Sequence, residues 1–89
     1  MDDNTILIQL EELVVRLGIT IRHEPLKIDG LTHTGGYCRI RGQALLIINK
    51  KVTTREKIHI LIDALKRYAL SQIYILPSLR EMLDVGNGQ

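Results

Sequence analysis

The sequence predicts a single α+β domain in which an N-terminal helix, a second long helix and a short C-terminal helix pack with a three-stranded sheet. In two segments the apolar residues recur at helical spacing. In three short segments apolar and polar residues alternate, or all residues are apolar, as is typical of strands. The 89-residue length fits one domain, residues 1–89, and a hydrophobic fraction of 45% excludes a disordered chain.

Residues 4–17 are predicted to form the first helix. Their apolar side chains recur at helical spacing, Asp3 or Asn4 can cap the start, and Gly18 can supply a left-handed residue past the end. Residues 19–23 then alternate between apolar and polar, which is typical of a half-buried strand.

The middle of the chain predicts a loop followed by a hairpin. Residues 27–36 are polar and glycine-punctuated and show no period, so we expect a loop. Residues 37–41 alternate, and residues 44–48 form a continuous apolar run that suits a central strand covered on both faces. Gly42 allows a tight turn, which favours a hairpin around residues 41–43.

Alternation in the first hairpin strand separates its side chains into two groups. Cys38 and Ile40 share one face, whereas Arg39 and Arg41 share the other. We expect the face of Cys38 to be the core face, where the thiol would fill a small apolar slot.

The C-terminal half predicts the second long helix and a short last one. Thr53 and Glu56 have capping-box spacing, which marks the start of the long helix. Residues 72–76 fit either a helix or a strand, residues 77–84 form the short helix, and residues 85–89 form a frayed tail. The predicted core consists of Leu10, Leu13, Leu17, Ile21, Ile40, Leu46, Ile48, Ile58, Ile62 and Leu65.

Composition excludes several classes of function. A net charge of +2 is too small for a strong phosphate-binding signature, and one cysteine cannot form an internal disulfide or a multi-thiolate metal site. The acidic start lacks the basic region of a signal peptide, and no apolar run is long enough to span a membrane. We therefore expect a cytoplasmic protein with no membrane contact and no cofactor.

Protein interaction is the function that the residues favour. Ile8 and Val15 lie seven residues apart, off the main apolar stripe of the first helix, and Ile60 lies off the stripe of the second. A small domain with apolar residues outside its core stripe often buries them against another chain. The sequence therefore predicts a non-catalytic interaction or regulatory module that self-associates or docks on a protein partner.

A small metal-dependent enzyme or metalloregulator is the alternative. The loop residue His33 lies near Cys38, the only thiol. Glu56, His59 and Asp63 share one helix face at spacings of three and four residues, which could present ligands to a transition metal. The same pattern is typical of a solvated helix face, where His59 and Asp63 would form a weak surface pair.

Nucleic-acid binding is a weaker alternative. Arg39, Arg41, Lys50 and Lys51 could gather at one end of the hairpin with Tyr37 beside them. A stacking platform normally uses several aromatic side chains on a strand face, so nucleic acid is not the expected partner.

The stretch GYCRIRGQALLIINKKVTTREKIHILIDALK, residues 36–66, resembles the core of the ImmA/IrrE zinc metallopeptidases. In that family a strand ending in Ile-Asn, here Ile48 and Asn49, leads into a helix that bears HExxH. The positions that match the motif's two histidines are Ile62 and Lys66, and Asp63 matches its glutamate. The resemblance therefore implies a small bacterial protein reduced from that family, with no zinc site and no peptidase activity.

Overall fold

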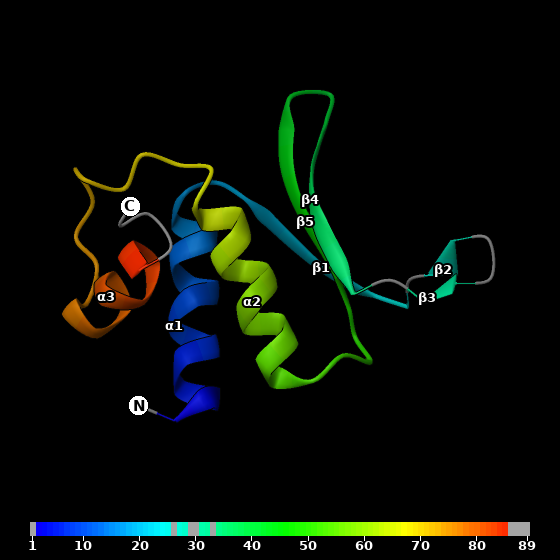
Figure 1. The fold of residues 1–89 in the computed structure, drawn as a ribbon. Coiled ribbons are helices and arrows are strands. Elements are labelled where there is room, and N and C mark those ends of the chain that lie inside the picture. The colour runs from blue at the N-terminus through cyan, green and yellow to red at the C-terminus, as the bar shows by residue number, and fades with distance from the viewer. Residues whose placement is uncertain (1, 26, 29–30, 33, 86–89) are drawn as a thin grey trace.

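The computed structural model describes residues 2–25, 27–28, 31–32 and 34–85. As the sequence predicts, the described chain has an α+β fold that begins with a helix and contains a three-stranded mixed sheet. Figure 1 shows α1 and α2 side by side on one face of the sheet, with α3 beyond α1. In chain order the elements are α1 (Asp3–Arg16), β1 (Thr20–Glu24), β2 (Lys27–Ile28), β3 (Leu31–Thr32), β4 (Gly35–Ile40), β5 (Gln43–Asn49), α2 (Thr54–Leu65) and α3 (Pro77–Val85).

Side-chain caps fix the starts of α1 and α2. The cap of α1 is Asp2, one residue before the predicted pair, and its carboxylate accepts a hydrogen bond from the Thr5 amide at 2.8 Å. The predicted capping box of α2 is confirmed, because the Thr53 amide donates to the Glu56 carboxylate at 2.9 Å and the Glu56 amide donates to the Thr53 hydroxyl at 3.1 Å.

The apolar strand β5 lies at the centre of the sheet. It pairs in parallel with β1 and antiparallel with β4, so Leu46 has Ile21 on one side and Tyr37 on the other. The helices cover only the face that carries Ala44, Leu46 and Ile48. The expectation that β5 is covered on both faces is therefore wrong, although Leu45 on the open face is buried between its strand neighbours.

A two-residue turn joins β4 to β5. Arg41 has a φ of 53° and Gly42 a φ of 82°, and positive values at both central positions are those of a type I′ hairpin turn. Gln43 already pairs with Ile40 in the ladder, so the turn is one residue shorter than the predicted one.

The turn fixes the register of the hairpin and corrects the predicted orientation of β4. Tyr37 lies on the helix-covered face, packed against the core, whereas Cys38 is half-buried on the open face. Ile40 shares the open face and is 52% exposed, so its assignment to the core is wrong. Alternation divides a strand into two faces, but only the pairing with β5 decides which of them meets the helices.

The predicted loop over residues 27–36 contains more structure than expected. Lys27 pairs with Thr32 and Ile28 pairs with Leu31, which makes β2 and β3 a small ribbon separate from the main sheet. The strand β4 begins at Gly35, inside the predicted loop.

The core lies between the helix-covered sheet face and the three helices. Three of the predicted core residues are only half-buried against it: Leu17, Ile21 and Ile62. The predicted core residues that the structure buries are Leu10, Leu13, Leu46, Ile48, Ile58 and Leu65.

The C-terminal segment contributes core residues that the sequence did not indicate. Residues 72–76 form neither a helix nor a strand, yet Ile75 is buried there, as are Leu79 and Leu83 of α3. α3 continues to Val85, the first residue of the predicted tail, and residues 86–89 lie outside the described residues. Within the described chain, no helix is long and apolar enough to cross a membrane.

Candidate functional site

The outer face of α1 carries two exposed aliphatic side chains. Ile8 is 54% exposed and Val15 is 60% exposed, two turns apart on the side of α1 that its neighbours leave uncovered. A shallow hollow lies between them, lined by these two residues with Glu11, Glu12 and Arg16. Both predicted interaction residues of the first helix therefore lie in one surface.

A groove continues this surface toward the C-terminal segment. It has a volume of about 340 Å³ and runs between α1 and residues 74–79, with Glu12 and Arg16 lining both the hollow and the groove. An Arg16 guanidinium nitrogen donates to the Tyr74 carbonyl at 3.5 Å, and the Tyr74 side chain is 71% exposed. We call Ile8, Glu12, Val15, Arg16 and Tyr74 the α1 surface.

The helix that carries the α1 surface is mainly acidic, although the surface itself holds one carboxylate, Glu12, and one guanidinium, Arg16. The stretch from Asp2 to Arg16 contains four carboxylate residues, Asp2, Asp3, Glu11 and Glu12, and one basic residue, Arg16. Glu11 lies 3.7 Å from the His23 imidazole on β1, a contact that becomes an ion pair only when the histidine is protonated. The whole chain carries +2, so α1 is an acidic element of a basic protein.

A second, smaller pocket lies between the start of β4 and α2. Its volume is about 190 Å³, and Gly35 and Gly36 form one wall while Ile60, Asp63 and Arg67 form the other. Ile60, the third predicted interaction residue, is half-buried against the core here and does not join the α1 surface. We call this site the β4 pocket.

A tyrosine pair adjoins the β4 pocket. The hydroxyls of Tyr37 and Tyr68 are 3.0 Å apart, and their rings meet edge to face with centroids 6.2 Å apart. Arg67 stacks on the Tyr37 ring at 4.9 Å, and Arg39 donates to the Tyr37 hydroxyl at 3.4 Å and to the Gly42 carbonyl at 2.7 Å.

The hydrogen bond between the two hydroxyls shifts their pKa values in opposite directions. The hydrogen bond from Tyr68, aided by Arg39, lowers the pKa of Tyr37. The hydrogen bond to Tyr37, aided by desolvation, raises the pKa of Tyr68. When Tyr37 has lost its proton, its oxygen accepts a hydrogen bond from the Tyr68 hydroxyl. The Tyr68 proton is therefore retained to higher pH.

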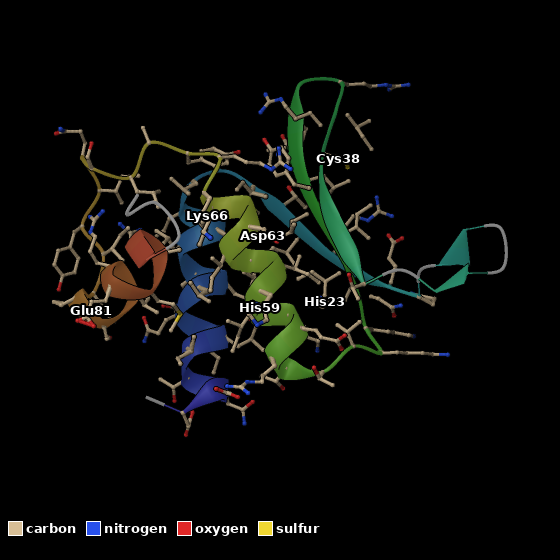
Figure 2. The ribbon with its side chains drawn as sticks, in the orientation of Figure 1. His23, Cys38, His59, Asp63, Lys66 and Glu81 are labelled. Carbon is tan, nitrogen blue, oxygen red and sulfur yellow. The ribbon has the colours of Figure 1, made fainter. Side chains whose placement is uncertain are left out.

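Within the described chain, the residues of the metal alternative do not gather into a site. The described residues hold no group of three or more His, Cys, Asp and Glu side chains that could bind a metal ion. Figure 2 shows Cys38 on the hairpin, away from His59 on α2, and the Glu56 carboxylate is used in the capping box. His33 lies outside the described residues.

The basic residues proposed for nucleic acid lie at opposite ends of the hairpin. Arg41 is in the turn between β4 and β5, whereas Lys50 and Lys51 follow the far end of the seven-residue strand β5. The prediction that they gather at one end is wrong, because a hairpin places the turn and the outer strand ends at maximum separation. Arg39 points to the helix-covered side and contacts Tyr37.

The positions that match HExxH lie at the C-terminal end of α2 and at the residue that caps it. Ile62 is half-buried against the core, whereas Asp63 and the cap residue Lys66, both labelled in Figure 2, are exposed. Comparison with known proteins finds no matching family model, no matching curated protein and no matching solved structure. The resemblance to the ImmA/IrrE family therefore stays a prediction from the residues alone.

Sequence reasoning missed Tyr74 and the tyrosine pair. Tyr74 lies in residues 72–76, where no period identifies the exposed side chains. The alternation of β4 does group Tyr37 with Arg39, so the signal for that contact was present. Its partner Tyr68 lies three residues after the end of α2, and only the packing of α2 on β4 brings the two together.

Proposed function

We propose that this chain is a non-catalytic interaction module of the bacterial cytoplasm that docks on a partner protein through the α1 surface. The observation that supports the proposal is the exposure of Ile8 and Val15 on one uncovered helix face, with Tyr74 in the adjoining groove. Scattered single apolar residues are common on protein surfaces, but three large ones around two adjoining depressions are typical of an interface.

The side chains match the anatomy of known interfaces. Two aliphatic residues and a tyrosine supply area that becomes buried on docking, and tyrosine is enriched at interfaces because its hydroxyl stays hydrogen-bonded. Glu12 and Arg16 lie between these apolar residues and can pair with a partner's charges at the rim.

The charge of α1 favours a basic partner over a second copy of the chain at this surface. Two copies related by a two-fold axis could pack Ile8 against Val15 of the other copy. That arrangement would bring Glu11 and Glu12 of both helices together on the axis, and four carboxylates there would repel one another. The occupant that fits is an amphipathic helix of another protein, with apolar residues seven apart and lysine or arginine between them.

Site-specific photo-cross-linking in cells tests this proposal. A photoreactive residue at Val15 should capture a partner that the same residue at Arg22, on β1, does not capture. Binding of the purified partner should then weaken at least about tenfold with Ile8→Asp and with Val15→Asp, and it should weaken with added salt.

Ile40→Asp is the matched control for these variants. Ile40 is 52% exposed, close to the 54% of Ile8, but it lies on the open sheet face. The control should leave partner affinity unchanged. The proposal fails if Val15 captures nothing beyond Arg22, or if Ile8→Asp binds the partner as tightly as the control does.

A further inference from the structure

The strand β4 is an unprotected edge of the main sheet. Among the described strands it pairs only with β5, and it is six residues long without a proline. Proteins usually shield such edges with prolines, bulges, short strands or inward-pointing charges, because the free backbone groups pair readily with another strand. The only charged side chain of β4 is Arg39.

The hydrogen-bond pattern tells which backbone groups of β4 are free for a new strand. The Asn49 amide donates to the Thr34 carbonyl at 2.8 Å, so Thr34 and Asn49 form a hydrogen-bonded pair at the end of the ladder. Hydrogen-bonded and non-bonded pairs alternate along antiparallel strands. The amides and carbonyls of Gly35, Tyr37 and Arg39 therefore point away from β5.

The residues of β4 complement themselves in one antiparallel register. When Tyr37 of one copy faces Tyr37 of a second copy, every pair from Thr34 to Ile40 overlaps. Gly35 then faces Arg39 of the second copy on the helix side, and Gly36 faces Cys38 of the second copy on the open side. A glycine thus makes room for a larger side chain on both faces of the sheet.

Charge favours the same register. Asp63 lines the β4 pocket beside Gly35, and within the described chain its carboxylate has no ion pair or hydrogen bond. An Arg39 side chain placed opposite Gly35 by the second copy would enter this pocket. The guanidinium is exposed, and turning it toward the carboxylate exchanges its bonds to the Tyr37 hydroxyl at 3.4 Å and to the Gly42 carbonyl at 2.7 Å for an ion pair that a guanidinium can make with two parallel hydrogen bonds.

We propose that a second copy of this chain pairs its β4 with β4 in antiparallel orientation about a two-fold axis at Tyr37. The two three-stranded sheets become one continuous sheet, and Arg39 of each copy binds beside Asp63 of the other. Figure 1 shows α2 between α1 and β4, so this contact leaves the α1 surface free for the partner of the proposed function. A result that rejects one of the two proposals therefore does not reject the other.

Disulfide trapping tests the register. A Cβ added at Gly36 would meet no atom within 4 Å, and the residue has no positive φ, so Gly36→Cys should fold normally. In the proposed register the introduced thiol faces Cys38 of the second copy as a non-hydrogen-bonded pair, where the Cα atoms are close enough for a disulfide. Mild oxidation should give a covalent dimer of twice the 10.1 kDa chain mass.

Two controls make this result specific. Adding Cys38→Ser to Gly36→Cys should abolish the covalent dimer, because the introduced thiols of the two copies do not face each other. The unmodified chain should cross-link far more slowly, since its Cys38 residues lie diagonal to each other across the axis. No covalent dimer from Gly36→Cys, or cross-linking of the unmodified chain as fast as that of Gly36→Cys, would overturn the register.

A charge exchange tests the contact between Arg39 and Asp63. In sedimentation equilibrium, Asp63→Lys should weaken dimerisation by about tenfold or more, and Glu81→Lys on the exposed far side of the molecule should not. Combining Asp63→Lys with Arg39→Glu should restore dimerisation. A chain that stays monomeric at high concentration, or a dimer that Asp63→Lys leaves unchanged, would overturn the proposal.

Discussion

Gly35→Ala is expected to destabilise the fold strongly, because two features of the structure require glycine there. Gly35 has a φ of +144°, a conformation that side-chain-bearing residues rarely adopt. A Cβ at this position would overlap the carbonyl oxygen of Ile47 and lie 3.1 Å from the Cα of Ile48. Both contacts are with backbone atoms, so no side chain can turn aside to relieve them.

The size of the effect follows from the strain and from the ladder that must open. Holding alanine at the unfavourable φ of Gly35 costs about 1–3 kcal/mol. Moving β4 away from β5 weakens the neighbouring hydrogen bonds, including the 2.8 Å bond from Asn49 to Thr34, at about 0.5–1.5 kcal/mol each. We expect a total loss of about 2–5 kcal/mol in the free energy of unfolding, a large share of what a small domain has.

Urea unfolding followed by far-ultraviolet circular dichroism measures this loss, at a concentration low enough to keep the chain monomeric. Gly36→Ala is the matched control on the adjacent residue, where a Cβ meets nothing within 4 Å, and it should change stability by less than about 1 kcal/mol. Equal stabilities for the two variants would refute the proposed close approach of β4 to β5.

Two further changes test the core and the tyrosine pair. Leu65→Ala removes a side chain of α2 that is 0% exposed, so the free energy of unfolding should fall by about 2–5 kcal/mol in urea unfolding, and a loss below about 0.5 kcal/mol would show that α2 packs through another face. Tyr68→Phe removes the hydrogen bond that lowers the pKa of Tyr37, so that pKa should rise toward 10.0 in a spectroscopic titration of tyrosinate. Because a lowered pKa favours the ionised form in the folded state, the stabilisation from ionised Tyr37 is present above the ordinary tyrosine pKa and is lost as the pH falls through the lowered value. A Tyr37 titration that Tyr68→Phe leaves unchanged would contradict the observed hydroxyl contact.

Local chemistry in the sequence determined the fold class, the start of α2 and the central strand. The capping box of Thr53 and Glu56 marks the start of α2 because it satisfies backbone amides within one turn of the chain. The apolar run of β5 likewise identified the central strand, because a continuous apolar run is typical of a strand flanked on both sides in a sheet. The two exposed residues of α1, Ile8 and Val15, were also found from their spacing alone.

Tertiary packing decided what the local pattern left open. Alternation gave β4 two faces, and the register set by the two-residue turn at Arg41 placed Tyr37 inward and Ile40 outward. Residues 72–76 have no period, so only their packing beside α1 revealed that Ile75 is buried and Tyr74 exposed. The β4 pocket and the tyrosine pair join segments far apart in the chain, with Tyr37 and Tyr68 separated by 31 positions, and contacts at that separation leave no periodic trace in the sequence.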